Sequence, residues 1–128
     1  MPSKKPNPTA AELEILRVLW DNGPLIVREI QRLMNAVKPT GYTTVLKMLQ
    51  IMTEKGLVLR DDTQRPQVYR ARFAREHTQR QMLKDLIARA FDGSVKALVL
   101  QAVAGKKSTR EELEEMERLL DRMEGDRK

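Results

Sequence analysis

The fold is decided by residues 42–71, which read YTTVLKMLQIMTEKGLVLRDDTQRPQVYRA. The first part of this stretch carries apolar residues at helical spacing. The predicted buried stripe consists of Val45, Met48, Leu49 and Met52. Gly56 follows at a position where helices commonly end in a left-handed residue. Two short apolar runs around a polar turn then fill 57–71, so the stretch predicts a helix over about 42–55 that leads directly into a β-hairpin.

Two more helices precede this stretch. Thr9 and Glu12 have the spacing of a capping box, which predicts a helix over about 10–22. Residues 27–35 carry apolar and charged side chains on opposite sides, as in a short amphipathic helix. Leu25-Ile26, between the two helices, is a candidate for a strand with a single bridge. A turn that contains Pro and Gly separates the second helix from the third.

Residues from Ala74 onward are predicted to be helical. One helix extends to about Phe91, and a second follows over about 95–103. A second capping box, at 108–111, opens a third helix whose apolar residues recur at spacings of three and four. Glycines lie between these helices and are predicted to end them.

Three helices followed by a hairpin form the order of a winged helix-turn-helix domain. The predicted fold is therefore mostly α with a small β-hairpin, divided into a winged-helix domain over 1–72 and a helical dimerisation domain over 73–128. The C-terminal helices carry more apolar residues than three helices can bury on one another, and a two-fold partner would cover the surplus. The predicted homodimer interface consists of Leu86, Ile87, Leu98, Val99, Leu113, Met116, Leu120 and Met123.

The charge and hydropathy of the chain indicate what kind of molecule it can bind. The chain has 128 residues with 24 Lys/Arg and 18 Asp/Glu, a net charge of +6. Residues 1–73 carry 12 basic and 7 acidic side chains, so this part is the candidate for binding a polyanion. No apolar run approaches the roughly 20 residues that a membrane span needs, and no apolar stretch typical of a secretory signal follows the N-terminus. We therefore expect a cytoplasmic protein without direct membrane insertion.

Catalytic and metal-binding residues are scarce. The sequence has one histidine, His77, three serines and no cysteine, and it lacks the P-loop, the dinucleotide-binding glycine motif and Gly-x-Ser-x-Gly. A single histidine without cysteine could form a transition-metal site within one chain only if carboxylates supplied nearly all the ligands. We therefore expect no enzymatic activity, no metal and no cofactor, and a hydrolase hidden in a small helical scaffold is the enzymatic alternative.

The helix over 42–55 has an open face opposite its buried stripe. Threonine can contact phosphates or the thymine methyl group, lysine can reach guanine acceptors, and glutamine can pair with adenine. Arginines on the hairpin are predicted phosphate ligands, although pairing with Asp61 or Asp62 is the alternative for Arg60 and Arg70. The predicted DNA-binding residues are Tyr42, Thr43, Thr44, Leu46, Lys47, Gln50, Arg60, Arg65 and Arg70.

A family resemblance is carried by the segments 13–20, 27–30, 42–49, 54–58, 68–70 and 91–120. In this order they resemble the penicillinase-repressor family (BlaI/MecI/CopY type), and the resemblance covers about residues 9–124. It implies a dimeric winged-helix repressor that binds double-stranded DNA at a dyad operator. For members with a β-lactam circuit, it also implies a membrane metalloprotease that cuts the C-terminal domain and so releases the DNA.

The sequence departs from that family at several positions. The family's cleaved Asn-Phe pair falls on Gln101-Ala102, so the resemblance does not extend to the cleavage site. The absence of cysteine excludes copper sensing through the family's cysteine cluster. An arginine of some recognition helices falls on Leu46. The usual helix caps fall on Ile26 and Ala74, whose side chains cannot accept a hydrogen bond, so these helix starts depend on packing.

The preferred interpretation is a sequence-specific transcriptional repressor, and two others remain open. A non-specific architectural DNA-binding protein would differ from a repressor only in its specificity ratio. A winged helix used as a protein-interaction module would bind no DNA, and its binding to a partner would be insensitive to salt.

Overall fold

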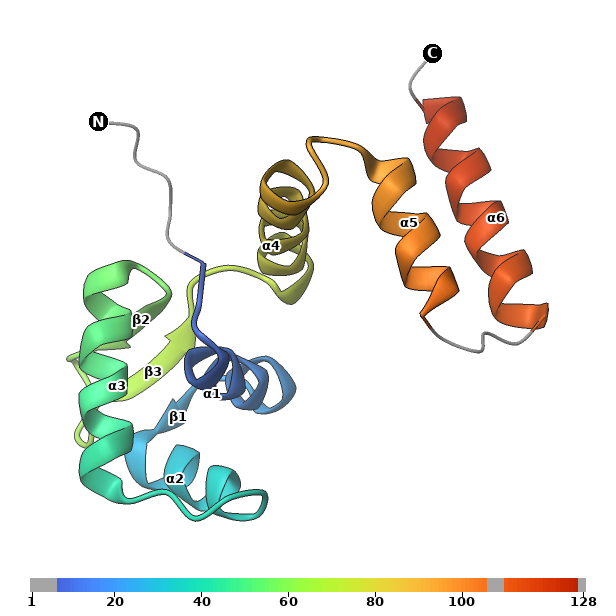
Figure 1. The fold of residues 1–128 in the computed structure, drawn as a ribbon. Coiled ribbons are helices and arrows are strands. Elements are labelled where there is room, and N and C mark those ends of the chain that lie inside the picture. The colour runs from blue at the N-terminus through green and yellow to red at the C-terminus, as the bar shows by residue number, and fades with distance from the viewer. Residues whose placement is uncertain (1–6, 106–109, 127–128) are drawn as a thin grey trace. The chain divides into compact units, whose positions relative to one another are not determined.

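The computed structural model describes residues 7–105 and 110–126 (Figure 1). Its elements are α1 (Ala10–Asn22), β1 (Leu25–Ile26), α2 (Val27–Asn35), α3 (Tyr42–Lys55), β2 (Val58–Asp61), β3 (Val68–Ala71), α4 (Arg75–Ala90), α5 (Val95–Ala104) and α6 (Arg110–Asp126). The prediction of a mostly helical winged helix-turn-helix fold is confirmed. The predicted bounds of the first three helices and the candidate strand at Leu25-Ile26 agree with these elements.

The start of α1 is the predicted capping box. The Thr9 hydroxyl oxygen accepts a hydrogen bond from the Glu12 N–H at 3.2 Å, and the Glu12 carboxylate accepts one from the Thr9 N–H at 2.9 Å. Both contacts satisfy donors that an unfinished helix turn would leave free. At the other end, Gly23 has a φ of +81° and donates its N–H to the Leu19 carbonyl at 2.8 Å.

The end of α3 is determined by Gly56, which adopts the left-handed conformation with φ +78°. The Gly56 N–H bonds to the Thr53 carbonyl at 3.1 Å, and the Leu57 N–H bonds to the Met52 carbonyl at 2.9 Å. These bonds satisfy carbonyl groups at the helix end and turn the chain sharply. The turn brings the chain directly into β2, so the hairpin begins beside the end of α3.

The sheet has three antiparallel strands in the order β1-β3-β2. β2 and β3 form the predicted hairpin, in which Val58 lies opposite Ala71. β1 pairs with the other edge of β3, with Leu25 opposite Tyr69. Tyr69 is 1% exposed, so the central strand joins the hairpin to the helical core. The hairpin is the wing of the fold, and its loop spans 62–67.

One apolar core joins α1, α2, α3 and the sheet, because α1 packs on α2 and α2 packs on α3. The buried apolar residues are Ile15, Leu16, Leu19, Val27, Ile30, Met34, Val45, Leu49, Met52, Leu57, Val58 and Tyr69. Met48, which the sequence placed in the buried stripe, is only partly buried against this core. The core therefore fixes one face of α3 and leaves the opposite face free.

The chain divides into two compact units between Leu83 and Lys84, beyond the predicted boundary after residue 72. The first turns of α4 belong to the winged-helix unit because they contact α1. The Trp20 indole N–H donates to the Phe73 carbonyl at 2.9 Å, Arg75 pairs with Asp21, and Thr78 is buried. The winged-helix unit thus includes an additional stretch of helix after the hairpin.

The second unit contains the rest of α4 together with α5 and α6. The Ser94 hydroxyl caps α5 by accepting a hydrogen bond from the Ala97 N–H at 3.0 Å. Among the side chains that the structure describes after Leu83, none is fully buried. Large apolar side chains here remain exposed: Leu86, Val95, Leu100, Leu113 and Leu119. This unit therefore has no closed apolar core of its own within the described residues.

Candidate nucleic-acid interface

The open face of α3 carries most of the predicted DNA-binding residues. Because Val45, Leu49 and Met52 anchor the helix in the core, side chains on the other side face solvent. The exposed polar residues on this face are Tyr42, Thr43, Thr44, Lys47 and Gln50. Together they present hydroxyl, ammonium and amide groups along one side of α3, and the other side of this helix is packed in the core.

Leu46 is the exception among the predicted residues of this face. It is partly buried and packs against the core. Successive residues of an α-helix are separated by about 100°, so Leu46 lies at the edge of the stripe begun by Val45. Sequence spacing alone assigned it to the open side, whereas the neighbouring elements cover much of its side chain. Its predicted contact with DNA is limited to the part that remains accessible.

The start of α3 is held by α2. The Gln31 side-chain amide donates to the Thr40 carbonyl at 3.3 Å, and the Asn35 side-chain oxygen accepts the Thr40 N–H. Gly41 occupies the N-cap position of α3 and has no side chain to cap the helix. No side chain at Gly41 therefore accepts a hydrogen bond from the first N–H groups of α3. Uncapped N–H groups at a helix start can bind negatively charged oxygens.

The wing arginines differ in their surroundings. The Arg60 Nε atom lies 2.8 Å from an Asp62 carboxylate oxygen. The pKa of the Arg60 guanidinium is raised, chiefly by a hydrogen bond with the Tyr69 side chain and then by Asp62. Arg65, in the wing loop, and Arg70, on β3, are exposed and form no ion pair among the residues that the structure describes. Arg65 and Arg70 are thus more available to a phosphate than Arg60.

Asp61 is the acidic group that shapes the wing turn. Its carboxylate accepts hydrogen bonds from the Thr63 N–H at 2.9 Å and from the Gln64 amide at 2.9 Å. The Thr63 hydroxyl bonds to the same carboxylate, and these contacts, with a smaller contribution from the charge of Arg70, lower the pKa of Asp61. Asp61 is therefore charged at neutral pH and stabilises the turn that presents Arg65.

An ion pair that the sequence did not reveal joins the end of α3 to the start of α1. The Lys55 ammonium lies 2.9 Å from both carboxylate oxygens of Glu12. Burial raises the pKa of the Glu12 carboxyl, but the hydrogen bond from Thr9 and the interaction with Lys55 outweigh it, so the pKa is lowered overall. The pair ties the last turn of α3 to the first turn of α1 and so helps to fix the position of α3.

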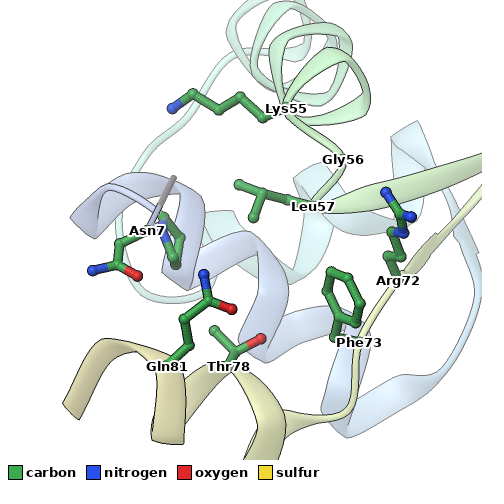
Figure 2. Close-up of a pocket in the computed structure, with 9 residues that line it drawn as sticks. Asn7, Lys55, Gly56, Leu57, Arg72, Phe73, Thr78 and Gln81 are labelled. Carbon is green, nitrogen blue, oxygen red and sulfur yellow. The ribbon is translucent and has the colours of Figure 1, made fainter. Parts of the chain in front are cut away.

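A small cavity lies where the end of α3, the end of β3 and the start of α4 meet (Figure 2). Its volume is about 30 Å³, and Leu57, Phe73 and Thr78 are among its lining residues. A space of this size holds about one water molecule. The cavity is therefore part of the packing around the end of α3 and is too small to hold an effector molecule.

No metal-ion cluster and no membrane-spanning helix occur in the part of the chain that the structure describes. Among the side chains that the structure describes, no group of three or more His, Asp or Glu residues is arranged to hold a metal ion. In the same part of the chain, no helix is long and apolar enough to cross a membrane. His77 is exposed and stacks on Phe73, with ring centroids 4.5 Å apart.

The predicted dimer residues lie on all three C-terminal helices. Leu86 is 46% exposed and Leu113 is 39% exposed. Partly buried positions are Ile87, Leu98, Val99 and Met116. The side chains of Leu120 and Met123 lie outside the described residues. Val95, Leu100 and Leu119, which the sequence prediction did not include, are also exposed apolar side chains.

Comparison with known proteins places the chain in a family. The family model described as "Penicillinase repressor" matches residues 8–122. A search among curated proteins found no match. A solved structure described as "Structure of reduced AbfR bound to DNA" is 19% identical, with 90% of this chain and 72% of that chain covered and a TM-score of 0.43. Because the family model spans both units, from α1 into α6, the chain belongs to the penicillinase repressor family of DNA-binding transcriptional regulators.

Proposed function

We propose that the protein represses transcription by binding a dyad operator as a homodimer. The observation that carries this proposal is the open face of α3, where Thr43, Thr44, Lys47 and Gln50 are exposed while the opposite face is locked into the core. A recognition helix of a helix-turn-helix domain enters the major groove with such a face toward the base edges.

The side chains of this face match the chemistry of the major groove. Lys47 would donate to the N7 and O6 acceptors of guanine, and Gln50 would pair with the N6 and N7 groups of adenine. Thr43 and Thr44, in the first turn, would contact phosphate oxygens or a thymine methyl group. Tyr42 would donate a hydrogen bond from its hydroxyl group to the DNA backbone. Base specificity is therefore assigned to the middle of α3, and register on the duplex to its first turn.

The wing would contact the sugar-phosphate backbone. Arg65 and Arg70 are the favoured ligands, since both are exposed and neither forms an ion pair among the described residues. Arg60 would first have to exchange its contact with Asp62 for a phosphate. Each phosphate contact releases counterions, so the wing contributes mainly to affinity and its salt dependence.

The homodimer is supported by the apolar surface of the second unit. Leu86, Leu113 and Leu119 are between 39% and 48% exposed. Apolar surface of this kind is usually covered by a partner, and a two-fold axis lets the same surface cover itself. A dimer would place two recognition helices on the two halves of a palindromic operator. Release of DNA by proteolysis is not part of this proposal, because Gln101-Ala102 stands where cleaved family members have an Asn-Phe pair.

The DNA part of the proposal is tested by fluorescence anisotropy. The purified protein is titrated into the duplex upstream of its own gene and into a scrambled duplex, each at two salt concentrations. We expect tight, salt-sensitive binding to the native duplex only, and Lys47→Ala should weaken it about tenfold or more, as loss of one base contact does. Lys96→Ala, at an exposed position of α5, is the matched control and should bind normally.

The alternatives give different outcomes in the same titration. Equal binding to both duplexes would indicate a non-specific architectural protein. Absence of binding even at low salt would contradict the DNA proposal and favour a protein-interaction module. Unchanged affinity of Lys47→Ala would remove Lys47 from the interface and leave the rest of the proposal in place.

The dimer is tested separately by sedimentation velocity. Leu113→Asp places a charge on an apolar surface that is exposed in the single chain, so it should yield a folded monomer with much weaker operator binding. Arg118→Asp, at an exposed position of the same helix, is the control and should remain dimeric. A dimeric Leu113→Asp variant would show that this part of α6 is not the interface.

A further inference from the structure

Arg28 lies on α2 and is not one of the residues that the sequence indicated for DNA binding. Its guanidinium carbon lies 5.9 Å from the centroid of the Tyr42 ring, at the first residue of α3. No ion pair involves Arg28 among the residues that the structure describes, and the adjacent Glu29 pairs with Arg32 at 2.8 Å. Arg28 is thus an exposed cation held beside the start of the recognition helix.

The same side of α2 fixes the segment that leads into α3. Gln31 and Asn35 both bind the backbone of Thr40, and they lie three and seven residues after Arg28. This spacing places the three side chains on one face of the helix. Figure 1 shows α2 beside the start of α3, in agreement with the packing of the two helices. The position of Arg28 relative to α3 is therefore set by hydrogen bonds and by the Tyr42 ring together.

We propose that Arg28 is a further DNA ligand that binds a backbone phosphate next to the groove entered by α3, with the Tyr42 ring as its positioning surface. This inference rests on the proposed function. In helix-turn-helix domains the helix before the recognition helix crosses the DNA backbone. A guanidinium can stack on an aromatic ring and still present its N–H groups to a phosphate in bidentate fashion.

The contact with the Tyr42 ring gives Arg28 an advantage over a freely moving side chain. An arginine that is already held in place loses less conformational freedom when it binds a phosphate. A phosphate contact carries no base information, so it should act equally on every duplex. A purely structural contact between Arg28 and Tyr42 would instead change protein stability and leave the salt dependence of binding unaltered. These two roles can be separated experimentally.

The test compares Arg28→Ala with wild type by anisotropy between about 50 and 200 mM salt. Loss of one phosphate contact should reduce the slope of log affinity against log salt by about 0.9 per bound protomer. When the salt concentration rises fourfold, the affinity of wild type should fall by a factor that is roughly 3.5 times larger than the factor for the variant, counted per protomer. For a dimer, the two factors should differ roughly twelvefold. The reduction should be the same on the operator and on a scrambled duplex, and Arg28→Lys should keep the wild-type slope.

Arg32→Ala is the matched control, because Arg32 is an exposed arginine one turn further along α2 that already has a partner in Glu29. It should leave the slope unchanged. Tyr42→Leu tests the positioning surface: in that background, Arg28→Ala should weaken binding less than it does beside the intact ring. Circular dichroism of each variant reports whether the winged helix is folded.

The outcomes separate this inference from the proposed function. If wild type binds no DNA, the proposed function fails and the inference fails with it. If wild type binds but folded Arg28→Ala keeps the full salt slope, only the inference is overturned. A loss confined to one DNA sequence would also overturn it, since that result would indicate a base contact.

Discussion

Replacement of Lys55 by methionine should destabilise the protein more than its surface position suggests. Methionine retains the length of the aliphatic stem and removes the cation that neutralises Glu12. The Glu12 side chain is 7% exposed and the Lys55 side chain is 30% exposed. The carboxylate would therefore remain in a buried position with the Thr9 contacts alone.

The magnitude follows from the burial of the two partners. Removal of one partner from a fully buried ion pair costs about 3–5 kcal/mol. Because Lys55 is partly accessible, water can replace some of its interaction, and we expect Lys55→Met to lower the free energy of unfolding by about 2 kcal/mol at pH 7. Glu12→Gln should cost only about 1 kcal/mol, because an amide can still accept the Thr9 N–H and Lys55 can extend toward solvent.

The pH dependence distinguishes this mechanism from simple loss of packing. In wild type the pKa of Glu12 is lowered in the folded state. The pair therefore contributes stability at pH values above the pKa of Glu12 in the unfolded chain, and this contribution is lost as the pH falls through the folded-state pKa. In Lys55→Met the buried carboxyl lacks its cation, so its pKa should be higher and protonation should relieve the penalty. The stability difference between variant and wild type should shrink in acid.

The assay is urea unfolding followed by circular dichroism at pH 7 and at about pH 4. Lys38→Met is the matched control, because Lys38 is exposed and should change stability by less than about 0.5 kcal/mol. The reasoning is refuted if Lys55→Met matches that control at pH 7. It is equally refuted if the loss is as large in acid as at neutral pH.

Two further substitutions test the ends of α1 and α3. Gly56→Ala should lower the free energy of unfolding by about 1 kcal/mol, because φ is +78° and the added Cβ would lie 2.8 Å from the Arg72 guanidinium, whose flexible side chain can move away; a urea midpoint equal to wild type would contradict this. Trp20→Phe should cost about 1–2 kcal/mol, because the Phe73 carbonyl loses its 2.9 Å hydrogen bond. Since Trp20 is the single tryptophan of the chain, thermal melting by circular dichroism is the appropriate measurement, and an unaltered melting temperature would show that the bond contributes nothing.

Much of the fold could be predicted because its signals are local. The Thr9–Glu12 capping box and the left-handed Gly56 each involve residues within a few positions of one another. Apolar periodicity likewise predicted the buried face of α3, and the open face followed from it. The candidate strand at Leu25-Ile26 was recognisable because it interrupts two helical patterns. For these features a stretch of about ten residues contains the physical cause.

The candidate site was predicted less completely. Thr43, Thr44, Lys47 and Gln50 lie on the exposed face as expected. Leu46 is partly covered, however, because the burial of a residue at the edge of a stripe depends on how closely the neighbouring elements approach. Arg60 is bound by Asp62 and Tyr69, so its availability depends on hairpin register and not on its position in the sequence alone.

The sequence by itself determined the order of the elements, their ends and the polar face of α3. Only the tertiary structure decided the contacts between distant segments. Lys55 reaches Glu12 across 43 positions, and Arg28 reaches the ring of Tyr42 across the turn between two helices. The first turns of α4 belong to the winged-helix unit, where Arg75 pairs with Asp21 of α1. The physical reason is that caps and periodicity act within one helix turn, whereas ion pairs, ring contacts and unit boundaries arise only when packing brings separate segments together.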